Sequence, residues 1–416
     1  MVIPGNIKEV DDCAFSMVKG KSLTVCEGVE TIGIQAFSYA DWETVSLPLG
    51  IKSMGKSVFA CCKKLKSIEI PEDFTSISCR AFSDCTALED VRLPEGIKTI
   101  EEGAFKNCVS LESIIFPENL KVIGEWAFAE CEKLRGVTFP EGLESIGGHA
   151  FQHCQNIENI YIPASVTGIG YYAFNRCYSL KDITVSNENL KFVSHDGVLF
   201  DKAEHFLFQY PIGNERTSYN IPVTSDPFFE IWNGAFDGAK NLVTVTLPDD
   251  LYFIWGEAFL NVPNMTSVRI PKTVHLIDVK GLGYTDGGKV EGFTIYGYKG
   301  SEAERYANAA ENMFIFIPLD EDQPIVTQPD GLLGDVNLNG IVDATDASMA
   351  LEYYSLKSVG ENPSFTPQQK YNADIDENEI IDAIDASSIL SYYTYSSTGG
   401  DKSSNDFFGR TYTFVP

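Results

Sequence analysis

Apolar residues recur over most of the chain with a period of 22 or 23 residues. Each unit carries an Ala-Phe pair, replaced once by Val-Phe. The pairs are Ala14-Phe15, Ala36-Phe37, Val58-Phe59, Ala81-Phe82, Ala104-Phe105, Ala127-Phe128, Ala150-Phe151, Ala173-Phe174, Ala235-Phe236 and Ala258-Phe259. Prolines and cysteines keep the same spacing, so three columns of residues stay in phase. A constant period of this length indicates a stack of repeated supersecondary units.

One unit, residues 111–131, shows what each repeat contributes, and its sequence is LESIIFPENLKVIGEWAFAEC. Ile114 and Phe116 stand at alternate positions, which predicts a short strand, and Pro117 ends it because proline cannot donate to a continuing ladder. A second extended piece at 121–123 leads through Gly124 into the turn that carries the Ala-Phe pair. One unit cannot close its own core, but stacked units bury each other's apolar edges. We therefore expect a mainly β solenoid with about 23 residues per coil.

Six of the ten cysteines occupy one column, three residues after the phenylalanine of their unit. They are Cys62, Cys85, Cys108, Cys131, Cys154 and Cys177. Thiols are small, apolar and among the most buried side chains. Equivalent residues of adjacent coils lie about 4.8 Å apart, so the column predicts a ladder of buried free thiols rather than a metal site. The other four, Cys13, Cys26, Cys61 and Cys79, leave one disulfide open as an alternative.

The repeat Leu-x-x-Ile-x-Leu-Pro-x-x-Leu-x-x-Ile-Gly-x-x-Ala-Phe-x-x-Cys resembles the BspA-type leucine-rich repeat, a family of bacterial surface and secreted proteins. The resemblance covers roughly residues 1–318. The period fails between Phe174 and Phe236, where residues near 186–222 resemble the long, hairpin-containing repeat of that family, and Asp196-Gly197 fits its tight turn. Residues near 293–318 predict a terminal cap, a helix with Ser301 and Glu304 in a capping pattern and then a strand.

The position before each Ala-Phe pair varies from coil to coil. It places Trp126, His149 and Tyr172 side by side in successive coils, with Tyr171 adjacent. A row of exposed rings could stack on sugar faces or anchor a protein partner. We therefore expect a protein or glycan ligand at these four residues, and the alternative is scattered surface aromatics without a ligand.

The repeats contain no recognisable catalytic motif. None of the five histidines lies in an HExxH sequence, and neither a Gly-x-Ser-x-Gly elbow nor a P-loop occurs. No pair of acids stands out from the repeating background, as the paired carboxylates of a glycosidase would. We expect no catalytic residues, and hence no enzyme activity.

After residue 318 the composition changes. Residues 319–333 are acidic, contain two prolines and lack periodicity, which is typical of a linker. Two segments 39 residues apart then carry the oxygen ligands of an EF-hand-like calcium loop at positions 1, 3, 5, 7, 9 and 12. These ligands are Asp335, Asn337, Asn339, Ile341 (backbone carbonyl), Asp343 and Asp346, then Asp374, Asp376, Asn378, Ile380 (backbone carbonyl), Asp382 and Asp385. The sequence therefore predicts two calcium ions.

Each loop runs into a helix, and the duplicated loop-helix resembles a type I dockerin over residues 334–398. The resemblance implies calcium-dependent docking onto a cohesin module of a cellulosome scaffoldin, in either of two opposite orientations. It implies contacts from Ala344, Thr345, Met349, Leu351, Glu352 and Tyr353 in the first copy, and from Ala383, Ile384, Ser388, Leu390, Ser391 and Tyr392 in the second. Residues 399–416 form a tail whose aromatic side chains either pack back as a clasp or form a disordered end.

Charge narrows the class of partner. The 416 residues carry 59 acidic against 31 basic side chains, a formal net charge of −28. Nucleic acid and anionic membranes would be repelled, and no stretch approaches the roughly 20 consecutive apolar residues that span a bilayer. The first residues, MVIPGNIKEVDD, lack the cationic start and apolar run of a signal peptide. The two resemblances nevertheless imply an extracellular, cell-surface or cellulosome-associated protein.

These features predict a non-catalytic interaction or adhesion protein of a polysaccharide-degrading complex. Calcium-dependent dockerin–cohesin binding would anchor it, and the repeats would recognise a protein or glycan. The alternative is a cellulosomal enzyme, or a regulator or inhibitor of such enzymes, with its site on the repeat domain.

Overall fold

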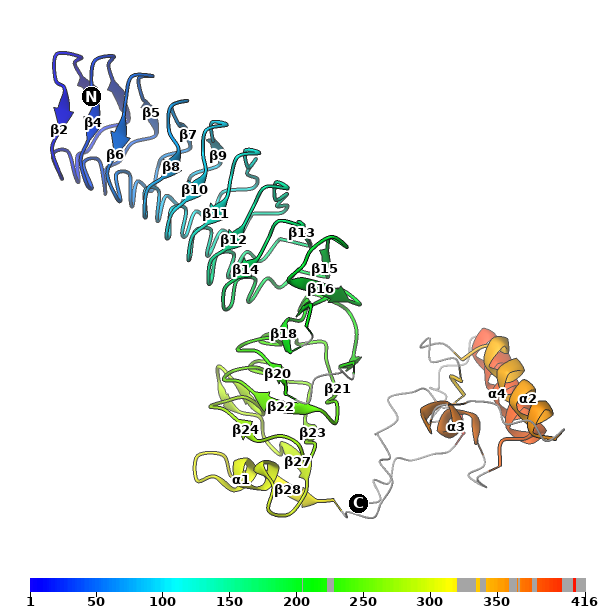
Figure 1. The fold of residues 1–416 in the computed structure, drawn as a ribbon. Coiled ribbons are helices and arrows are strands. Elements are labelled where there is room, and N and C mark those ends of the chain that lie inside the picture. The colour runs from blue at the N-terminus through cyan, green and yellow to red at the C-terminus, as the bar shows by residue number, and fades with distance from the viewer. Residues whose placement is uncertain are drawn as a thin grey trace. The chain divides into compact units, whose positions relative to one another are not determined.

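The computed structural model describes residues 1–203, 205–222, 228–319, 334–336, 342–358, 365, 367–375, 380–398 and 407–408. They belong to two compact units, Met1–Pro318 and Leu319–Pro416 (Figure 1). Apart from Leu319, the linker that the sequence predicts at 319–333 lies outside the described residues, and so does the tail at 399–416 apart from Phe407 and Phe408.

The first unit is a β solenoid, as the repeat predicts. Each regular coil contributes two short strands, and strands of successive coils pair in parallel with a register step of one repeat, as for Ile68 beside Val91. The first strand column consists of β1 (Val2–Ile3), β3 (Ser22–Val25), β5 (Thr44–Ser46), β7 (Ser67–Glu69) and β9 (Asp90–Arg92), then β13 (Asn159–Ile162) with β15 (Asp182–Val185), β19 (Ser218–Asn220) with β21 (Thr244–Thr246), and β23 (Ser267–Arg269), β27 (Thr294–Gly297) and β28 (Ile315–Pro318).

The second strand column lies on another side of each coil. It consists of β2 (Glu9–Val10), β4 (Thr31–Ile32) and β6 (Ser53–Met54), then β8 (Ser76–Ile77), β10 (Thr99–Ile100), β11 (Val122–Ile123), β12 (Ser145–Ile146) and β14 (Gly168–Ile169), and finally β16 (Phe192–His195), β17 (Val198–Asp201), β18 (Phe206–Gln209), β20 (Phe229–Ile231), β22 (Leu251–Ile254) and β24 (Leu276–Ile277). A small antiparallel ribbon, β25 (Tyr284–Thr285) with β26 (Gly288–Lys289), follows.

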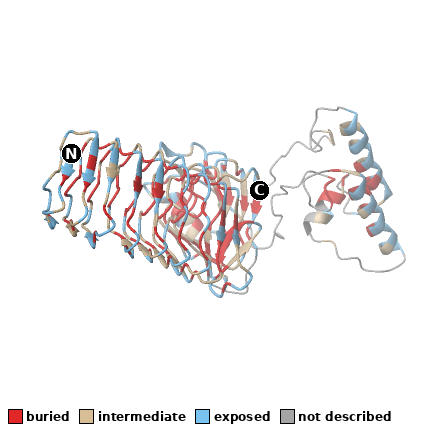
Figure 2. Cartoon of the chain, turned by 90° about the horizontal axis from the view of Figure 1, so that it is seen from above, coloured by how far each residue is buried: buried red, intermediate tan, exposed pale blue. Residues whose placement is uncertain are grey.

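The Ala-Phe pairs form the centre of the solenoid, where buried residues line the inside of every coil (Figure 2). The phenylalanines of the pairs from Ala36-Phe37 to Ala173-Phe174 are at most 1% exposed, and neighbouring ring centroids lie 5.2–5.9 Å apart in a continuous stack. Offset stacking adds to the roughly 1.5–3 kcal/mol that burial of each such ring contributes.

The cysteine column lies beside this stack. All six of its thiols are fully buried, and none of the ten cysteines forms a disulfide, so the prediction of a ladder of buried free thiols is confirmed. Each thiol donates to the carbonyl of the phenylalanine one coil earlier, as Cys131 Sγ does to Phe105 O at 3.2 Å. A thiol suits the position because it is small and apolar and can still donate this weak hydrogen bond, which an alanine could not.

Each regular coil turns through two residues with left-handed backbone. Trp126 and Glu130 are an example, with φ of 60° and 64°. Their amides donate to the next coil, Trp126 N to Gly148 O at 2.9 Å and Glu130 N to Gln152 O at 2.7 Å. A left-handed residue other than glycine costs about 1–2 kcal/mol, and here the cost is offset by a backbone ladder that joins coil to coil.

The long repeat contains the predicted hairpin. Strands β16 and β17 pair antiparallel, and the turn between them is Asp196-Gly197, with φ of 51° and 79°. Positive φ at both central residues is what a type I′ turn requires, and it matches the twist of the two strands. Strand β17 then pairs antiparallel with β18, after which the parallel order β18-β20-β22-β24 resumes.

The terminal cap has the predicted helix and strand, but the predicted capping pattern is wrong. Helix α1 (Glu302–Asn308) begins after Ser301, whose hydroxyl donates to Tyr298 O instead of accepting from the helix. Glu304 accepts from Gly300 N at 2.7 Å, one residue before the N-cap. The hydroxyl thus serves as a donor within the turn at 298–301 and does not cap the helix.

The second unit is helical. It contains α2 (Ala344–Ser358), α3 (Pro367–Ala373) and α4 (Ala383–Ser397). Helices α2 and α4 pack together, and small side chains such as Ala350 and Ala386 allow their close approach in a core that also holds Val336 and Ile389. None of the helices in the described residues is long and apolar enough to cross a lipid bilayer.

Candidate functional sites

The row of rings that the sequence predicts, Trp126, His149 and Tyr172, forms a stack in which the rings lie face to face. The ring centroids of Trp126 and His149 lie 3.9 Å apart at an interplanar angle of 5°, and those of His149 and Tyr172 lie 5.0 Å apart at 20°. The ammonium group of Lys106 lies over Trp126 from the preceding coil, 4.7 Å from its centroid. All three residues have the same left-handed backbone conformation, with φ of 56–60°, so their side chains leave equivalent positions of successive coils.

The stacking changes what these residues can offer a ligand. Both faces of His149 are covered by other rings, and burial lowers the pKa of this histidine, which keeps the imidazole neutral in the stack. A sugar needs a free ring face, whereas this stack presents ring edges. Of the four predicted residues, Tyr171 has the freest side chain, at 55% exposed.

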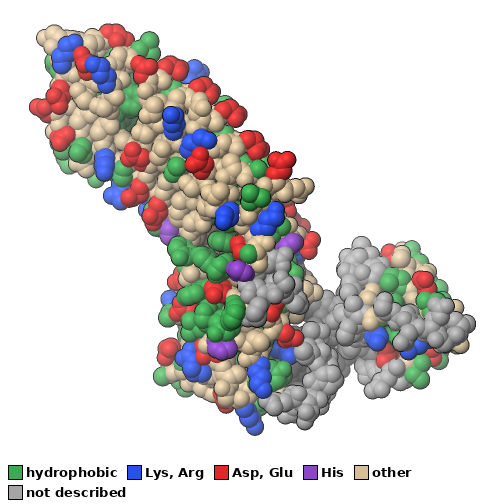
Figure 3. All heavy atoms as spheres, in the orientation of Figure 1, with side chains coloured by type: hydrophobic (Ala, Val, Ile, Leu, Met, Phe, Trp, Pro, Cys, Tyr) green, Lys and Arg blue, Asp and Glu red, His purple; other side chains and the backbone are tan. Residues whose placement is uncertain are grey.

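A second aromatic surface was missed by the sequence analysis. We call it the aromatic sheet face, and it consists of Phe206, Phe208, Trp232, Phe253 and Trp255, all half-buried, on and just after β18, β20 and β22. Figure 3 shows hydrophobic side chains gathered over this part of the solenoid. Interaction sites of proteins use apolar surfaces of this kind.

The rings of the aromatic sheet face also cover one another. Trp232 lies between Phe208 and Tyr171, with centroids 5.0 and 5.1 Å away, and Phe206 meets it edge-on at 4.7 Å. Trp255 Nε1 donates to Glu230 Oε2 at 2.6 Å. The sequence did carry a signal, because the segments FLFQ and YFIW put aromatic residues where earlier coils have serine, threonine or glycine.

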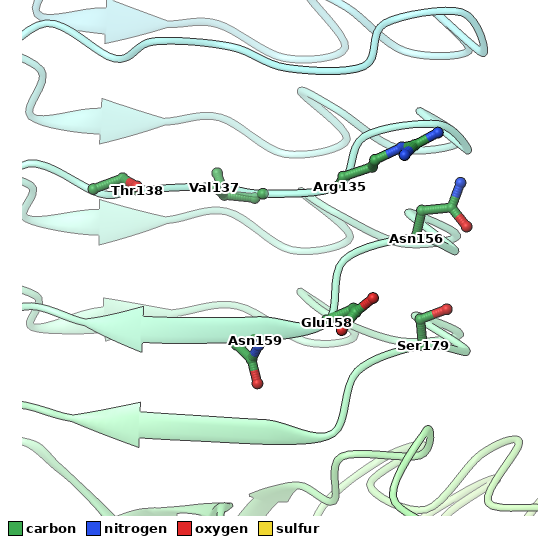
Figure 4. A pocket seen from close by; sticks show the side chains of 8 residues that line it. Arg135, Val137, Thr138, Asn156, Glu158, Asn159 and Ser179 are labelled. Carbon is green, nitrogen blue, oxygen red and sulfur yellow. The ribbon is translucent and has the colours of Figure 1, made fainter.

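A polar cavity of about 530 Å³ opens where the first strand column is interrupted. Between β9 and β13 this column has no strand pairing, only an isolated bridge from Ser113 to Gly136. Arg135, Thr138, Asn156, Glu158 and Asn159 line the cavity from two adjacent coils (Figure 4). It holds one carboxylate, so it does not supply the pair of acids that the enzyme alternative requires.

The buried thiols should be chemically inert in the folded chain. Burial raises the pKa of Cys131 and of Cys177 to about 12, so both remain neutral thiols rather than reactive thiolates. We expect at most four thiols, those of Cys13, Cys26, Cys61 and Cys79, to react with a disulfide reagent before denaturation, and all ten after it. A spectrophotometric thiol count in native buffer and in denaturant measures this, and rapid reaction of more than four native thiols would contradict it.

The two predicted calcium loops are each closed by a buried aspartate at position 12. Asp346 accepts from Val336 N through Oδ1 and from Asp343 N through Oδ2, both at 2.9 Å. Asp385 repeats the arrangement with Ile375 N at 2.7 Å and Asp382 N at 2.9 Å. Both carboxylates are 0% exposed, so each ties the start and the end of its loop to the following helix.

Position 9 has a second task in both loops. Asp343 Oδ1 accepts from Thr345 N and Asp382 Oδ1 accepts from Ile384 N, each at 2.6 Å, which caps the start of α2 and of α4. This hydrogen bonding to the charged form lowers the pKa of Asp343. A capping aspartate also complements the positive end of the helix dipole.

The donor chemistry suits calcium. Among the described residues, no three His, Cys, Asp or Glu side chains form a group that could hold a metal ion. The predicted ligands Asn337, Asn339, Ile341, Asp376 and Asn378 lie outside the described residues. The described ligands Asp335, Asp346 and Asp385 bring hard, buried carboxylate oxygens to the loops, and Asp343, Asp374 and Asp382 are half-buried. Hard oxygens of this kind are what calcium prefers.

Most of the predicted cohesin contacts are exposed, three are half-buried and one is buried. Ala344, Thr345, Leu351, Glu352, Ala383, Ile384, Leu390 and Ser391 are exposed, and Met349, Ser388 and Tyr392 are half-buried. Tyr353 is only 7% exposed, because its ring packs on Phe365 with centroids 4.4 Å apart, so the structure removes it from the surface. The next residue in each helix, Tyr354 and Tyr393, is exposed instead.

The second copy encloses its equivalent tyrosine in the same manner. Tyr392 contacts Phe407 and Phe408, with ring centroids 5.5 and 5.8 Å apart. In both copies a phenylalanine from the segment after the helix therefore covers the tyrosine, Phe365 in the first and the Phe407–Phe408 pair in the second. At Phe407 and Phe408 the tail therefore packs back as the clasp that the sequence analysis offered as one alternative, whereas the cover of Tyr353 by Phe365 was not predicted.

A β solenoid of about 23-residue coils, followed by a compact helical unit, defines a repeat protein with a small second module. The model for the BspA type leucine rich repeat region matches in six copies at residues 1–112, 98–196 and 214–282, and the chain belongs to this family. Residues 333–392 match the dockerin type I domain.

Solved structures of bacterial repeat proteins have a similar fold. A leucine rich cell surface protein from Faecalibacterium prausnitzii is 23% identical, with a TM-score of 0.54, over 67% of this chain and 83% of its own. A leucine-rich repeat protein from Bacteroides ovatus is 27% identical, with a TM-score of 0.53, over 77% and 83%. No curated protein sequence matches the chain.

Proposed function

We propose that the chain is a non-catalytic extracellular interaction or adhesion protein, held on a cellulosome scaffold by calcium-dependent binding of its dockerin to a cohesin module. The dockerin match at residues 333–392 carries this proposal, because dockerins are modules that bind cohesins. The family of the repeats supports the extracellular location, since one similar solved structure is described as a cell surface protein.

Calcium is the cofactor of this proposal. Asp335, Asp343 and Asp346 would hold one ion with the other predicted ligands of the first loop, and Asp374, Asp382, Asp385 and the Ile380 carbonyl would take part in holding the second. Bound calcium would neutralise carboxylates that otherwise repel one another. The chain's own contribution is the pair of buried position-12 aspartates, which fix both ends of each loop.

The cohesin surface would be the exposed sides of α2 and α4. Leu351 and Leu390 stand at equivalent positions of the two copies and are 48% and 47% exposed. They are the large apolar residues of the predicted set that both copies expose, so we take the leucines as the shared apolar anchors of this surface. Ile384 is a further exposed apolar residue, at 61%, in the second copy alone. The shared leucines favour docking in two orientations, whereas the difference between Thr345 and Ile384 at equivalent positions speaks against it.

Charge at these leucines should disrupt docking. We expect the double variant Leu351→Asp with Leu390→Asp to lose about 2 kcal/mol or more of cohesin affinity, roughly 30-fold, because buried apolar anchors dominate interfaces. Each single variant should lose less if the other copy can take over. Calorimetric titration with cohesin modules in calcium measures the effect, and an unchanged melting temperature is the control. Full affinity in the double variant would remove this surface from the proposal.

The repeat domain would supply the recognition surface for a protein or glycan. The aromatic sheet face and Tyr171 support this role, because half-exposed tryptophan, tyrosine and phenylalanine rings dominate binding energy where they meet a partner. The sequence-predicted set Trp126, His149, Tyr171 and Tyr172 adjoins this face through the contact of Tyr171 with Trp232.

Binding of the full chain to a panel of cohesin modules and of plant polysaccharides tests the proposed function. We expect tight cohesin binding in millimolar calcium, and no turnover of polysaccharide or casein. Absence of binding to every cohesin would overturn the anchoring role. Turnover that disappears when one acidic pair of the repeats is replaced would instead favour a cellulosomal enzyme.

A further inference from the structure

The repeat domain contains two hydrophobic cores rather than one. The first runs from Ile3 to Leu199 and the second from Val198 to Phe314. The phenylalanine stack shows the same division, because it is continuous up to Phe174 and begins again with Phe236 against Phe259. The break coincides with the irregular repeat.

Strand β17 forms the wall between the two cores. Side chains on a strand alternate between its two faces. Leu199 belongs to the first core, whereas its neighbours Val198 and Phe200 belong to the second, and all three are 0% exposed. The hairpin thus closes one stack with one face and opens the next stack with the other.

The backbone ladder of the turns also stops at this point. Before it, Phe151 N donates to Ala173 O at 2.8 Å and His153 N to Asn175 O at 2.9 Å. All residues of the turns 172–176 and 234–238 are described, and no backbone hydrogen bond joins the two turns. Elsewhere in the array this ladder makes neighbouring coils a continuous structure.

Side chains centred on Asp237 replace the missing ladder. This aspartate is 2% exposed, and its Oδ2 accepts from Asn175 Nδ2 at 3.0 Å and from Arg176 Nε at 2.8 Å. Its Oδ1 accepts from Asn261 Nδ2 at 2.8 Å. Arg176 also donates to Asp286 Oδ1 at 3.2 Å. One buried carboxylate therefore joins two residues of the first block to the second.

We propose that the repeat domain is two cooperative folding blocks that meet at β17, and that the Asp237 cluster is the latch that couples them. Within a block, coils share an apolar core, a ring stack and a backbone ladder, so they fold together. Across the seam, the turn side is coupled by the polar contacts of this one carboxylate and by a few further contacts. These are the stack of Tyr171 on Trp232, the hydrogen bond that the Tyr172 hydroxyl donates to Glu257 Oε2 at 3.5 Å, and the backbone hydrogen bond from Gly213 N to Leu180 O at 2.7 Å. The joint is where the recognition surface can change its curvature without unfolding either block.

Hydrogen exchange of the full chain, followed by mass spectrometry across a denaturant titration, tests this inference. In Asp237→Ala we expect peptides from residues 1–185 to keep one midpoint and peptides from 229–318 to keep another, with the two midpoints farther apart than in the unmodified chain. Adding Phe105→Ala, in the first core, should then lower only the first midpoint. Asp237→Asn, which keeps the shape and loses the charge, should separate the midpoints less.

The matched control is Gln152→Ala. Gln152 Nε2 donates to Asn175 Oδ1 at 3.0 Å, a contact between side chains one coil earlier, where the backbone ladder is present. In this variant, peptides from the coils before and after the Gln152–Asn175 contact should keep a common denaturation midpoint. The inference is overturned if Gln152→Ala divides the first block, or if every peptide of Asp237→Ala and Asp237→Ala with Phe105→Ala shares a single midpoint.

Discussion

Removal of calcium should abolish cohesin binding and unfold residues 334–398, while the solenoid keeps its fold. The physical reason lies in the two loops, where the buried carboxylates of Asp346 and Asp385 join other acids around each predicted ion. Without a cation these negative charges repel one another where little water screens them. The free energy of calcium binding therefore contributes directly to the folding of the module. The module has a small core of its own, so it has little other stabilisation to oppose the repulsion.

Two signals separate the two units in one experiment. The described helices longer than seven residues are α2 and α4, so the far-UV helical signal reports mainly on the second unit. All ten cysteines lie at or before Cys177, so the thiol count reports on the first block of the solenoid and not on the second unit. In excess chelator we expect the helical signal to collapse and the six column thiols to stay unreactive, with recovery on addition of calcium. Nanomolar cohesin binding in chelator would refute the calcium dependence.

Substitution of the loop-closing aspartates should reproduce part of this effect. An asparagine has one accepting oxygen, so Asp346→Asn leaves either Val336 N or Asp343 N without its acceptor, and Asp385→Asn does the same in the second loop. A buried donor left unsatisfied costs about 1–3 kcal/mol, on the order of tenfold or more in calcium affinity. Calcium titration of each variant measures the loss.

Truncation of a central phenylalanine should have the largest effect on the stability of the repeat domain. Phe128 is fully buried, lies 5.2 Å from Phe105 and 5.4 Å from Phe151 between centroids, and meets Phe116 edge-on. We expect Phe128→Ala to lower the free energy of unfolding by about 3–5 kcal/mol, because the transfer energy of the ring is lost and a cavity remains. Equilibrium denaturation, followed by the thiol count, measures it.

Ile115 provides the control from the same repeat. It is also a large apolar residue, but 85% of its surface is exposed. Ile115→Ala should therefore change the free energy of unfolding by no more than about 0.5 kcal/mol, as surface substitutions usually do. Equal effects of the two substitutions would show that the ring stack does not carry the stability of the coils.

The sequence predicted the solenoid because its period is a local property repeated many times. The equivalents of Ala127 and Phe128 are buried in every copy from Ala36-Phe37 to Ala258-Phe259, so the same burial pattern recurs along the chain, and the pair of the first copy is more exposed. The dockerin module was recognisable for a related reason, since the spacing of oxygen-bearing side chains within one loop is a local property of the sequence. The capping of α1 was predicted wrongly, because the hydroxyl of Ser301 can either accept from a helix amide or donate to the Tyr298 carbonyl, and sequence spacing does not choose between the two.

By itself the sequence determined the coil, its columns and the duplicated loop-helix, since each follows from contacts at one constant spacing. Only the tertiary structure decided which ring faces remain free, as for His149 between Trp126 and Tyr172, and that Phe365 would cover Tyr353. It alone placed Asp237 against Asn175 and Arg176, about sixty residues earlier in the chain. The reason is physical: these contacts join segments at separations that no repeat specifies, so they depend on how whole coils pack in space.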